Sequence, residues 1–150
     1  MYKRILVAVD TSSTARKALD EAIALAGILG AQLCVLHVAD EASLVQHGMG
    51  LGSYLDVDRA RTEIRSFGSQ LLAEAVARAG AAGCQAEQRL IESTRPRVAP
   101  VIDEAAREWK ADLVVVGAHG RRGFERMLVG SVAEHLTRIA STSLLIIREQ

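Results

Sequence analysis

Short runs of consecutive apolar residues are the feature that most limits which folds this chain can adopt. Residues 5–9 and 113–116 contain no polar residue, and the second run directly follows Asp112. A strand that is covered by helices on both faces of a parallel sheet has this composition. Residues 144–147 are a further apolar run, and residues 32–38 are mostly apolar, with Gln32 and His37 as the exceptions. The sequence therefore predicts strands at these four places, with the first two buried on both faces.

Between these runs, apolar residues recur every three or four positions, as in amphipathic helices. The first such stripe follows capping side chains at residues 10–13 and ends near Gly30, a typical helix stop. We expect the following residues to face the sheet: Ala15, Ala18, Leu19, Ala22, Ile23 and Ala26; Ile64, Phe67, Leu71 and Ala75, with Gly80 and Gly83 closing that helix; Val98, Val101, Ile102, Ala105 and Trp109; Val132, Leu136 and Ile139.

Two segments fit the alternation less regularly. Residues 84–91 contain four polar side chains among apolar ones, which is typical of a strand at the edge of a sheet. Residues 40–57 contain Gly48, Gly50 and Gly52 and have no consistent period. We expect this second segment to be a flexible excursion.

Strands that alternate with helices pair in parallel through right-handed crossovers. The 150 residues, 49% of them hydrophobic, fit one core. The prediction is thus an α/β fold: a single domain over residues 1–150 with a doubly wound five-stranded parallel sheet, order 3-2-1-4-5, and helices on both faces. Ligands of such sheets bind outside the carboxyl ends of the strands, which here means after Val9, Val38 and Val116.

Charge and composition exclude several classes of function. Eighteen basic residues balance eighteen acidic ones, so no overall field attracts nucleic acid. No apolar run reaches the roughly 18 residues of a membrane span, and the first run is too short for a signal peptide. Cys34 and Cys84 lack CxxC spacing, and no three histidines have the spacing of metal ligands. We expect a soluble cytoplasmic protein without membrane insertion.

A glycine-rich turn follows the fourth strand. It reads Gly117-Ala118-His119-Gly120-Arg121-Arg122-Gly123, and Gly130-Ser131 opens the last helix. Glycines let backbone N–H groups approach phosphate oxygens, and the N-terminus of a helix favours an anion. Glycine count alone fits a tight strand-to-helix connection equally well. The position at the expected crevice favours a phosphate site.

The spacing Gly117-x2-Gly120-x9-Gly130-Ser131 resembles the nucleotide-binding signature of the universal stress protein family. The resemblance extends over the whole chain, from the opening Ile-Leu-Val-Ala-Val-Asp to the helix that begins Gly-Ser-Val-Ala-Glu. It implies that ATP, with ADP or AMP as alternatives, is bound together with a magnesium or manganese ion carried by the phosphates. It also implies that Asp10 holds the ribose, Val38 faces the adenine, and Gly120, Gly130 and Ser131 hold phosphates.

Other residues complete the expected site. Arg121 and Arg122 lie in the glycine turn, where guanidinium groups can reach phosphates or remain in solvent. His119 lines the phosphates or points to solvent, and Asp10 has capping of the first helix as its alternative role. The candidate nucleotide contacts are Ala8, Val9, Asp10, Val38, Val116, Gly117, His119, Gly120, Arg121, Arg122, Gly123, Gly130, Ser131 and Val132.

The resemblance implies a partner as well. In that family the last strand commonly pairs with its counterpart in a second subunit, so we expect a homodimer through residues 143–148, with a tetramer as a further option. Residues 141–143 lack the proline often found before this strand, and residues 91–96 lack the usual glycine turn. A regulatory protein partner of unknown identity is also expected.

Several functions stay open on the sequence alone. The main one is a nucleotide-dependent homodimeric switch in the stress response. A slow ATPase is an alternative, but no general base is evident, so any hydrolysis is at most weak. A flavin carrier would use the hydroxyl-rich residues 10–14, although only five aromatic residues are present. The last alternative is a dimerisation module without a ligand.

Overall fold

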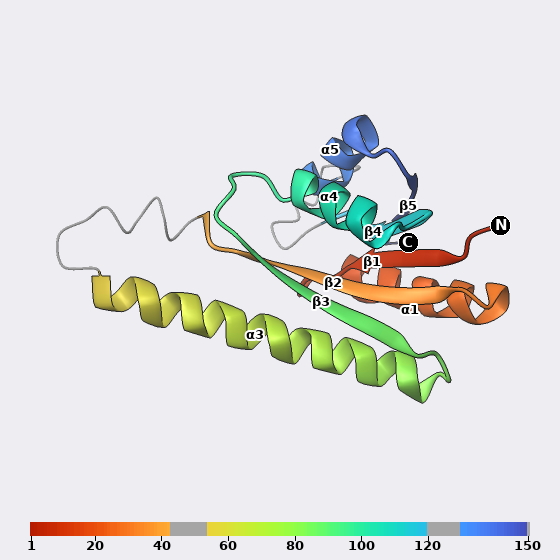
Figure 1. The fold of residues 1–150 in the computed structure, drawn as a ribbon, viewed down its shortest axis with the longest axis horizontal. Coiled ribbons are helices and arrows are strands. Elements are labelled where there is room, and N and C mark those ends of the chain that lie inside the picture. The colour runs from red at the N-terminus through yellow and green to blue at the C-terminus, as the bar shows by residue number, and fades with distance from the viewer. Residues whose placement is uncertain (43–53, 120–129, 150) are drawn as a thin grey trace.

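The computed structural model describes residues 1–42, 54–119 and 130–149, which form five strands and four helices (Figure 1). Their bounds in chain order are β1 (Arg4–Ala8), α1 (Ser13–Leu29), β2 (Gln32–Asp40), α3 (Tyr54–Ala81), β3 (Ala86–Ser93), α4 (Ala99–Trp109), β4 (Leu113–Gly117), α5 (Ser131–Ile139) and β5 (Ser143–Ile147).

The strands form one sheet in the order β3-β2-β1-β4-β5, and every neighbouring pair is parallel. The predicted fold class and strand order are therefore confirmed, including β3 at an edge. Leu6 in the central strand is in register with Cys34 of β2 and Val114 of β4. All three side chains are buried, as the apolar runs require.

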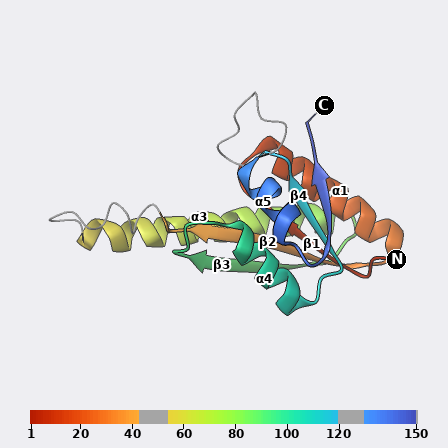
Figure 2. The ribbon, with the colours of Figure 1, turned by 90° about the horizontal axis from the view of Figure 1, so that it is seen from above.

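Helices cover both faces of the sheet (Figures 1 and 2). On one face, α1 and α3 pack against alternate residues of the strands, such as Ile5 and Val35. On the other face, α4 and α5 pack against Leu6 and Leu36. Because successive strand residues point to opposite faces, one continuous apolar strand supplies both cores.

Capping side chains fix the ends of α1 as the sequence predicts. Ser12 is the N-cap, and its Oγ accepts a hydrogen bond from the N–H of Ala15 at 3.1 Å. Gly30 ends the helix in the left-handed conformation with φ of 63°, and its N–H donates to the carbonyl of Ala26. A residue with a β-carbon is strained in that conformation, which explains the glycine.

The buried stripe of α3 differs from the predicted one. Phe67 was expected to face the sheet, but 49% of its surface is exposed. The helix buries Ala75, as predicted, together with Gly68, Leu72 and Ala79, which were not in the predicted stripe. A β-carbon on Gly68 would lie 2.8 Å from both His37 Cδ2 and Leu90 Cδ1. The helix therefore approaches the sheet closely at Gly68, and this turns the side chain of Phe67 outward.

Two other expectations need correction. The irregular segment predicted at residues 40–57 is shorter, because Asp40 still pairs with Ser93 of β3 and α3 already begins at Tyr54. The remaining residues of that prediction, 43–53, lie outside the described residues. Ile139 is 37% exposed because it is the last residue of α5, beyond the buried Leu136.

Both cysteines are free thiols in different surroundings. Cys34 lies in β2 with no exposed surface, and burial raises the pKa of its thiol to about 11. Cys84 precedes β3, is partly exposed, and has a thiol pKa that burial also raises. Within the described ranges, no helix is both long enough and apolar enough to cross a bilayer.

These thiols provide a test of the packing. The thiolate is the reactive form, so a thiol that is buried and has a pKa near 11 should not react at neutral pH. We expect a chromogenic disulfide reagent to modify one thiol in the native protein and two after denaturation. In Cys84→Ser, native protein should show no reaction. A rapid reaction of that variant before unfolding would contradict the burial of Cys34.

Candidate functional site

The candidate site lies where the strand order reverses, at the carboxyl ends of β1 and β4. These strands are neighbours, but the helix that follows β1 covers one face of the sheet and the helix that follows β4 covers the other. The two connections therefore part at this point, which leaves room for a ligand in folds of this kind. Asp10 follows β1 here, and His119 follows β4.

Asp10 supports the cap of α1 without being the cap. Its Oδ1 accepts hydrogen bonds from the N–H of Ser12, at 2.8 Å, and from the Ser12 hydroxyl. Ser12 itself caps the helix, so the alternative capping role of Asp10 falls to its neighbour. No hydrogen bond to Oδ2 is found among the described residues, and Asp10 is partly exposed. This second oxygen is an acceptor that a ligand hydroxyl can use.

Thr14 was not expected in the site, although it joins both connections. It lies in the first turn of α1 and is 1% exposed. Its Oγ1 donates a hydrogen bond to the carbonyl of His119 and accepts one, at 3.3 Å, from the N–H of the same residue. Thr14 lies four positions before Ala18 of the predicted inward stripe, so the pattern could have indicated a buried hydroxyl that needs partners, although not which partners.

Gly117 is explained by the close approach of α1. A β-carbon at this position would lie 2.6 Å from Thr14 Oγ1, 2.7 Å from the Thr14 carbonyl carbon and 2.8 Å from the Ala15 nitrogen. The space beside Gly117 is therefore filled by the first turn of α1. This glycine serves helix packing, in addition to any role in ligand binding.

The amide groups of the glycine turn are partly engaged within the protein. The N–H of Ala118 donates to the Ile147 carbonyl at 2.7 Å, and the N–H of Gly130 donates to the Ala118 carbonyl. The Gly130 N–H, which was expected to bind phosphate, closes the turn in this structure instead. Gly120, Arg121, Arg122 and Gly123 lie outside the described residues.

The first turn of α5 is the remaining anion-binding element. Gly130 is its N-cap, and no side chain of the described residues caps this end of the helix. For the N–H groups of residues 131–133, the described parts of the chain provide no hydrogen-bond acceptor. Ser131 is exposed and adds a hydroxyl donor. The helix dipole and these N–H groups favour a negative group at this end.

The apolar candidate residues fall into two groups. Ala8, Val38, Val116 and Val132 belong to the apolar cluster on the face of α4 and α5, in which Val116 is buried and the other three are partly exposed. Val9 belongs to the opposite face. Its N–H donates to Leu36 O at 2.8 Å, and its carbonyl lies 2.8 Å from His37 Nδ1, so its backbone groups are already bonded.

His119 does not point its Nδ1 to solvent. This nitrogen is buried, and no hydrogen-bond partner for it is found among the described residues. The backbone of His119 is held by Thr14, as described above. The side chain is therefore not solvated at Nδ1, and its expected place beside the phosphates stays a prediction.

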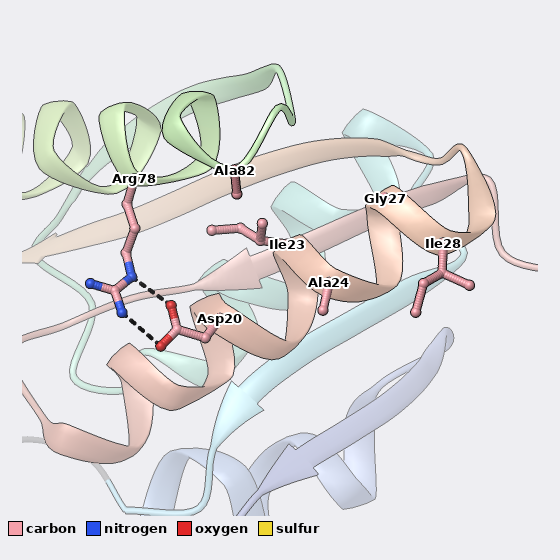
Figure 3. Close-up of a pocket in the computed structure, with 7 residues that line it drawn as sticks. All are labelled: Asp20, Ile23, Ala24, Gly27, Ile28, Arg78 and Ala82. Carbon is pink, nitrogen blue, oxygen red and sulfur yellow. Dashed lines mark hydrogen bonds and ion pairs between the residues drawn. The ribbon is translucent and has the colours of Figure 1, made fainter.

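A separate groove lies between α1 and α3 (Figure 3). It has a volume of about 520 Å³ and is lined by Asp20, Ile23, Ala24, Gly27, Ile28, Arg78 and Ala82. Arg78 and Asp20 form a bidentate ion pair. The Arg78 guanidinium is therefore already neutralised and is poorly suited to bind a phosphate. Ala82 follows the end of α3 and leads into the start of β3, so the groove lies toward the amino ends of the strands, away from the candidate site.

No metal centre is evident in the described part of the chain. No three side chains of histidine, cysteine, aspartate or glutamate cluster there. A divalent ion at this site would therefore depend on oxygen ligands from a bound phosphate group.

Comparisons with known proteins agree on one family. The model of the universal stress protein family matches residues 1–148. The universal stress protein YxiE of Bacillus subtilis is 33% identical over 99% of this chain and 100% of its own length. A universal stress protein in complex with cAMP has a TM-score of 0.66 and 26% identity, over 99% and 98% of the two chains. An Archaeoglobus fulgidus relative in complex with dAMP has a TM-score of 0.63, 23% identity and coverage of 97% and 98%.

The packing at Gly117 can be tested with two alanine substitutions. Gly117→Ala should destabilise the protein by ~1–3 kcal/mol, because its β-carbon meets backbone atoms of α1 that cannot move aside. Gly27→Ala lies in the last turn of α1, and no atom of another element lies within 4 Å of the added carbon, so it should stabilise the protein by about 0.5–1 kcal/mol. Urea unfolding measures both changes. Two changes of the same sign would contradict the close approach.

Proposed function

Since the chain belongs to the universal stress protein family, we propose that it binds ATP at the carboxyl ends of β1 and β4 and acts as a nucleotide-dependent regulatory protein in the stress response. The observation that carries this proposal is a pair of unused polar elements on opposite sides of the switch point. One is Oδ2 of Asp10, and the other is the N-terminus of α5; neither has a side-chain partner in residues 1–42, 54–119 and 130–149.

Each part of a nucleotide finds a chemically suitable group. A ribose hydroxyl donates to the free oxygen of Asp10. The base packs against the partly exposed Ala8, Val38 and Val132, with the buried Val116 beneath them in the same apolar cluster. Phosphate oxygens accept hydrogen bonds from the first turn of α5 and from the Ser131 hydroxyl. The relative in complex with cAMP supports an adenine nucleotide as the ligand class.

The remaining roles rest on the family resemblance. Gly120, Arg121, Arg122 and Gly123 contribute further phosphate contacts, and magnesium or manganese accompanies the phosphates of ATP. The free thiols of Cys34 and Cys84 fit a reducing compartment, so we place the protein in the cytoplasm. Regulation follows if a partner recognises only one of the two states, with or without nucleotide.

Isothermal titration with ATP, ADP, AMP and adenosine tests the proposal. Asp10→Asn keeps Oδ1 for Ser12 and replaces only the free oxygen, so ATP affinity should fall by roughly 10- to 100-fold while the fold is retained. Asp40→Asn is the matched control. It makes the same change at the end of β2, where Oδ1 accepts from Ala42 N at 3.0 Å, and it should leave affinity unchanged.

The result that would contradict nucleotide binding is also plain. The wild-type protein would give no heat with any of the four ligands, and mass spectrometry of freshly purified, denatured protein would detect no nucleotide. Equal affinities for the wild-type protein and Asp10→Asn would place the ligand elsewhere.

We also propose that β5 pairs with its counterpart in a second subunit, through residues 143–148. The strand lies at an edge of the sheet, and its side chains Leu144, Leu145, Ile146 and Ile147 are only partly buried. An unpaired edge with apolar side chains on both faces is suited to adding another strand. Two-fold symmetry then places the centres of the two strands side by side.

Light scattering after size exclusion tests this interface. The wild-type protein should have the mass of a dimer, or of a tetramer if dimers associate further. Leu145→Asp, at the middle of β5, brings two carboxylates close together and should yield monomers with unchanged helix content. Gln88→Asp adds the same charge to the exposed side of β3 at the other edge and should stay dimeric. A monomeric wild-type protein would contradict the proposal.

A further inference from the structure

One buried hydroxyl connects the two sides of the switch point. Thr14 is 1% exposed. A hydroxyl that is buried in this way needs hydrogen-bond partners within the protein. Its hydroxyl forms two hydrogen bonds to the backbone of one residue that follows β4, with the carbonyl and the N–H of His119. These groups are 105 positions away in the sequence. A side chain of α1 therefore satisfies the backbone at the end of β4.

Counting hydrogens fixes the direction of each bond. A hydroxyl has one hydrogen, and a carbonyl can only accept, so Thr14 donates to His119 O and accepts from His119 N. The Ser12 hydroxyl donates to Asp10 Oδ1 and accepts from Ala15 N. The two hydroxyls are 3.5 Å apart, and in this arrangement neither has a hydrogen left for the other. Ser12 thus holds Asp10, and Thr14 holds His119.

The hydrogen bonds between Thr14 and His119 are connected to the start of α5 by one further hydrogen bond. Ala118, next to His119, accepts a hydrogen bond from the N–H of Gly130, the N-cap of that helix. The chain of contacts runs from Thr14 through His119 and Ala118 to Gly130. The first turn of α1 therefore sets the position of the backbone on both sides of residues 120–129.

We propose that Thr14 is a positioning residue for the phosphate side of the nucleotide site. The inference rests on the proposed function. The hydroxyl does not contact the ligand; it holds the end of β4 and the start of α5 in place before the ligand arrives. Fixing a site in its bound geometry raises affinity because less conformational freedom is lost on binding.

This role makes a prediction that depends on phosphate. Removing the hydroxyl should weaken ATP binding roughly tenfold or more, since the His119 backbone loses its partner. Adenosine lacks phosphates and depends on Asp10, whose bonds to Ser12 are separate, so its affinity should change less than about twofold. In Asp10→Asn, by contrast, the affinities for ATP and adenosine should fall together.

The experiment compares Thr14→Val, Thr14→Ala and Thr14→Ser by titration with ATP and adenosine. Valine keeps the shape of threonine, alanine avoids any crowding against Gly117, and serine restores the hydroxyl. Serine should bind ATP within about threefold of the wild-type affinity. Thr62→Val is the control, because this threonine is exposed on α3 and its hydroxyl bonds only the carbonyl of Asp58 within its own helix.

Hydrogen exchange gives a readout that does not require a ligand. In Thr14→Val and Thr14→Ala, the amide of His119 should exchange at least about tenfold faster, while amides of β1 keep the wild-type rate. The proposal is overturned if the wild-type protein binds ATP and both variants bind it equally well, or if ATP and adenosine are weakened alike. If the wild-type protein binds neither ligand, the proposed function fails, and the positioning role fails with it whatever the exchange rates show.

Discussion

The close approach of α1 to the end of β4 is the contact on which the rest of the candidate site depends. It requires Gly117, because any β-carbon there would meet backbone atoms of the helix. It also brings the Thr14 hydroxyl against the backbone of His119. Parallel pairing of β1 with β4 places the two connections side by side, and this contact then sets how far apart they are.

The polar groups left free at this place differ from those suggested by the glycine pattern. The N–H groups of Ala118 and Gly130 are used to close the turn, so the anion-binding element described here is the start of α5. On the opposite side, Oδ1 of Asp10 accepts hydrogen bonds from the N-cap residue of α1, and no bond to Oδ2 is found among the described residues. Glycines thus build the turn, and within the described ranges the helix end and one carboxylate oxygen have no hydrogen-bond partner.

The sequence predicted the elements that depend on local pattern. Apolar runs located the strands, and the polar dilution of residues 84–91 correctly indicated an edge. The sequence pattern failed where tertiary contacts determine which side chains are buried. In α3, Gly68 faces the sheet and Phe67 is exposed, because a helix approaches a sheet most closely at its smallest residue. Thr14 was missed for a related reason. A hydroxyl in the first turn of a helix suggests a helix cap from the sequence. Only the fold shows that the Thr14 hydroxyl faces a residue 105 positions away.

The most direct test is a titration of isotope-labelled protein with ATP, followed by amide NMR. The account predicts that the largest shift changes occur at His119 and at residues 131–133, with smaller changes at Asp10. Changes confined to Ala24, Gly27 and Ala82 would place the ligand in the groove between α1 and α3 and would contradict the account. A spectrum that ATP does not alter would contradict it as well.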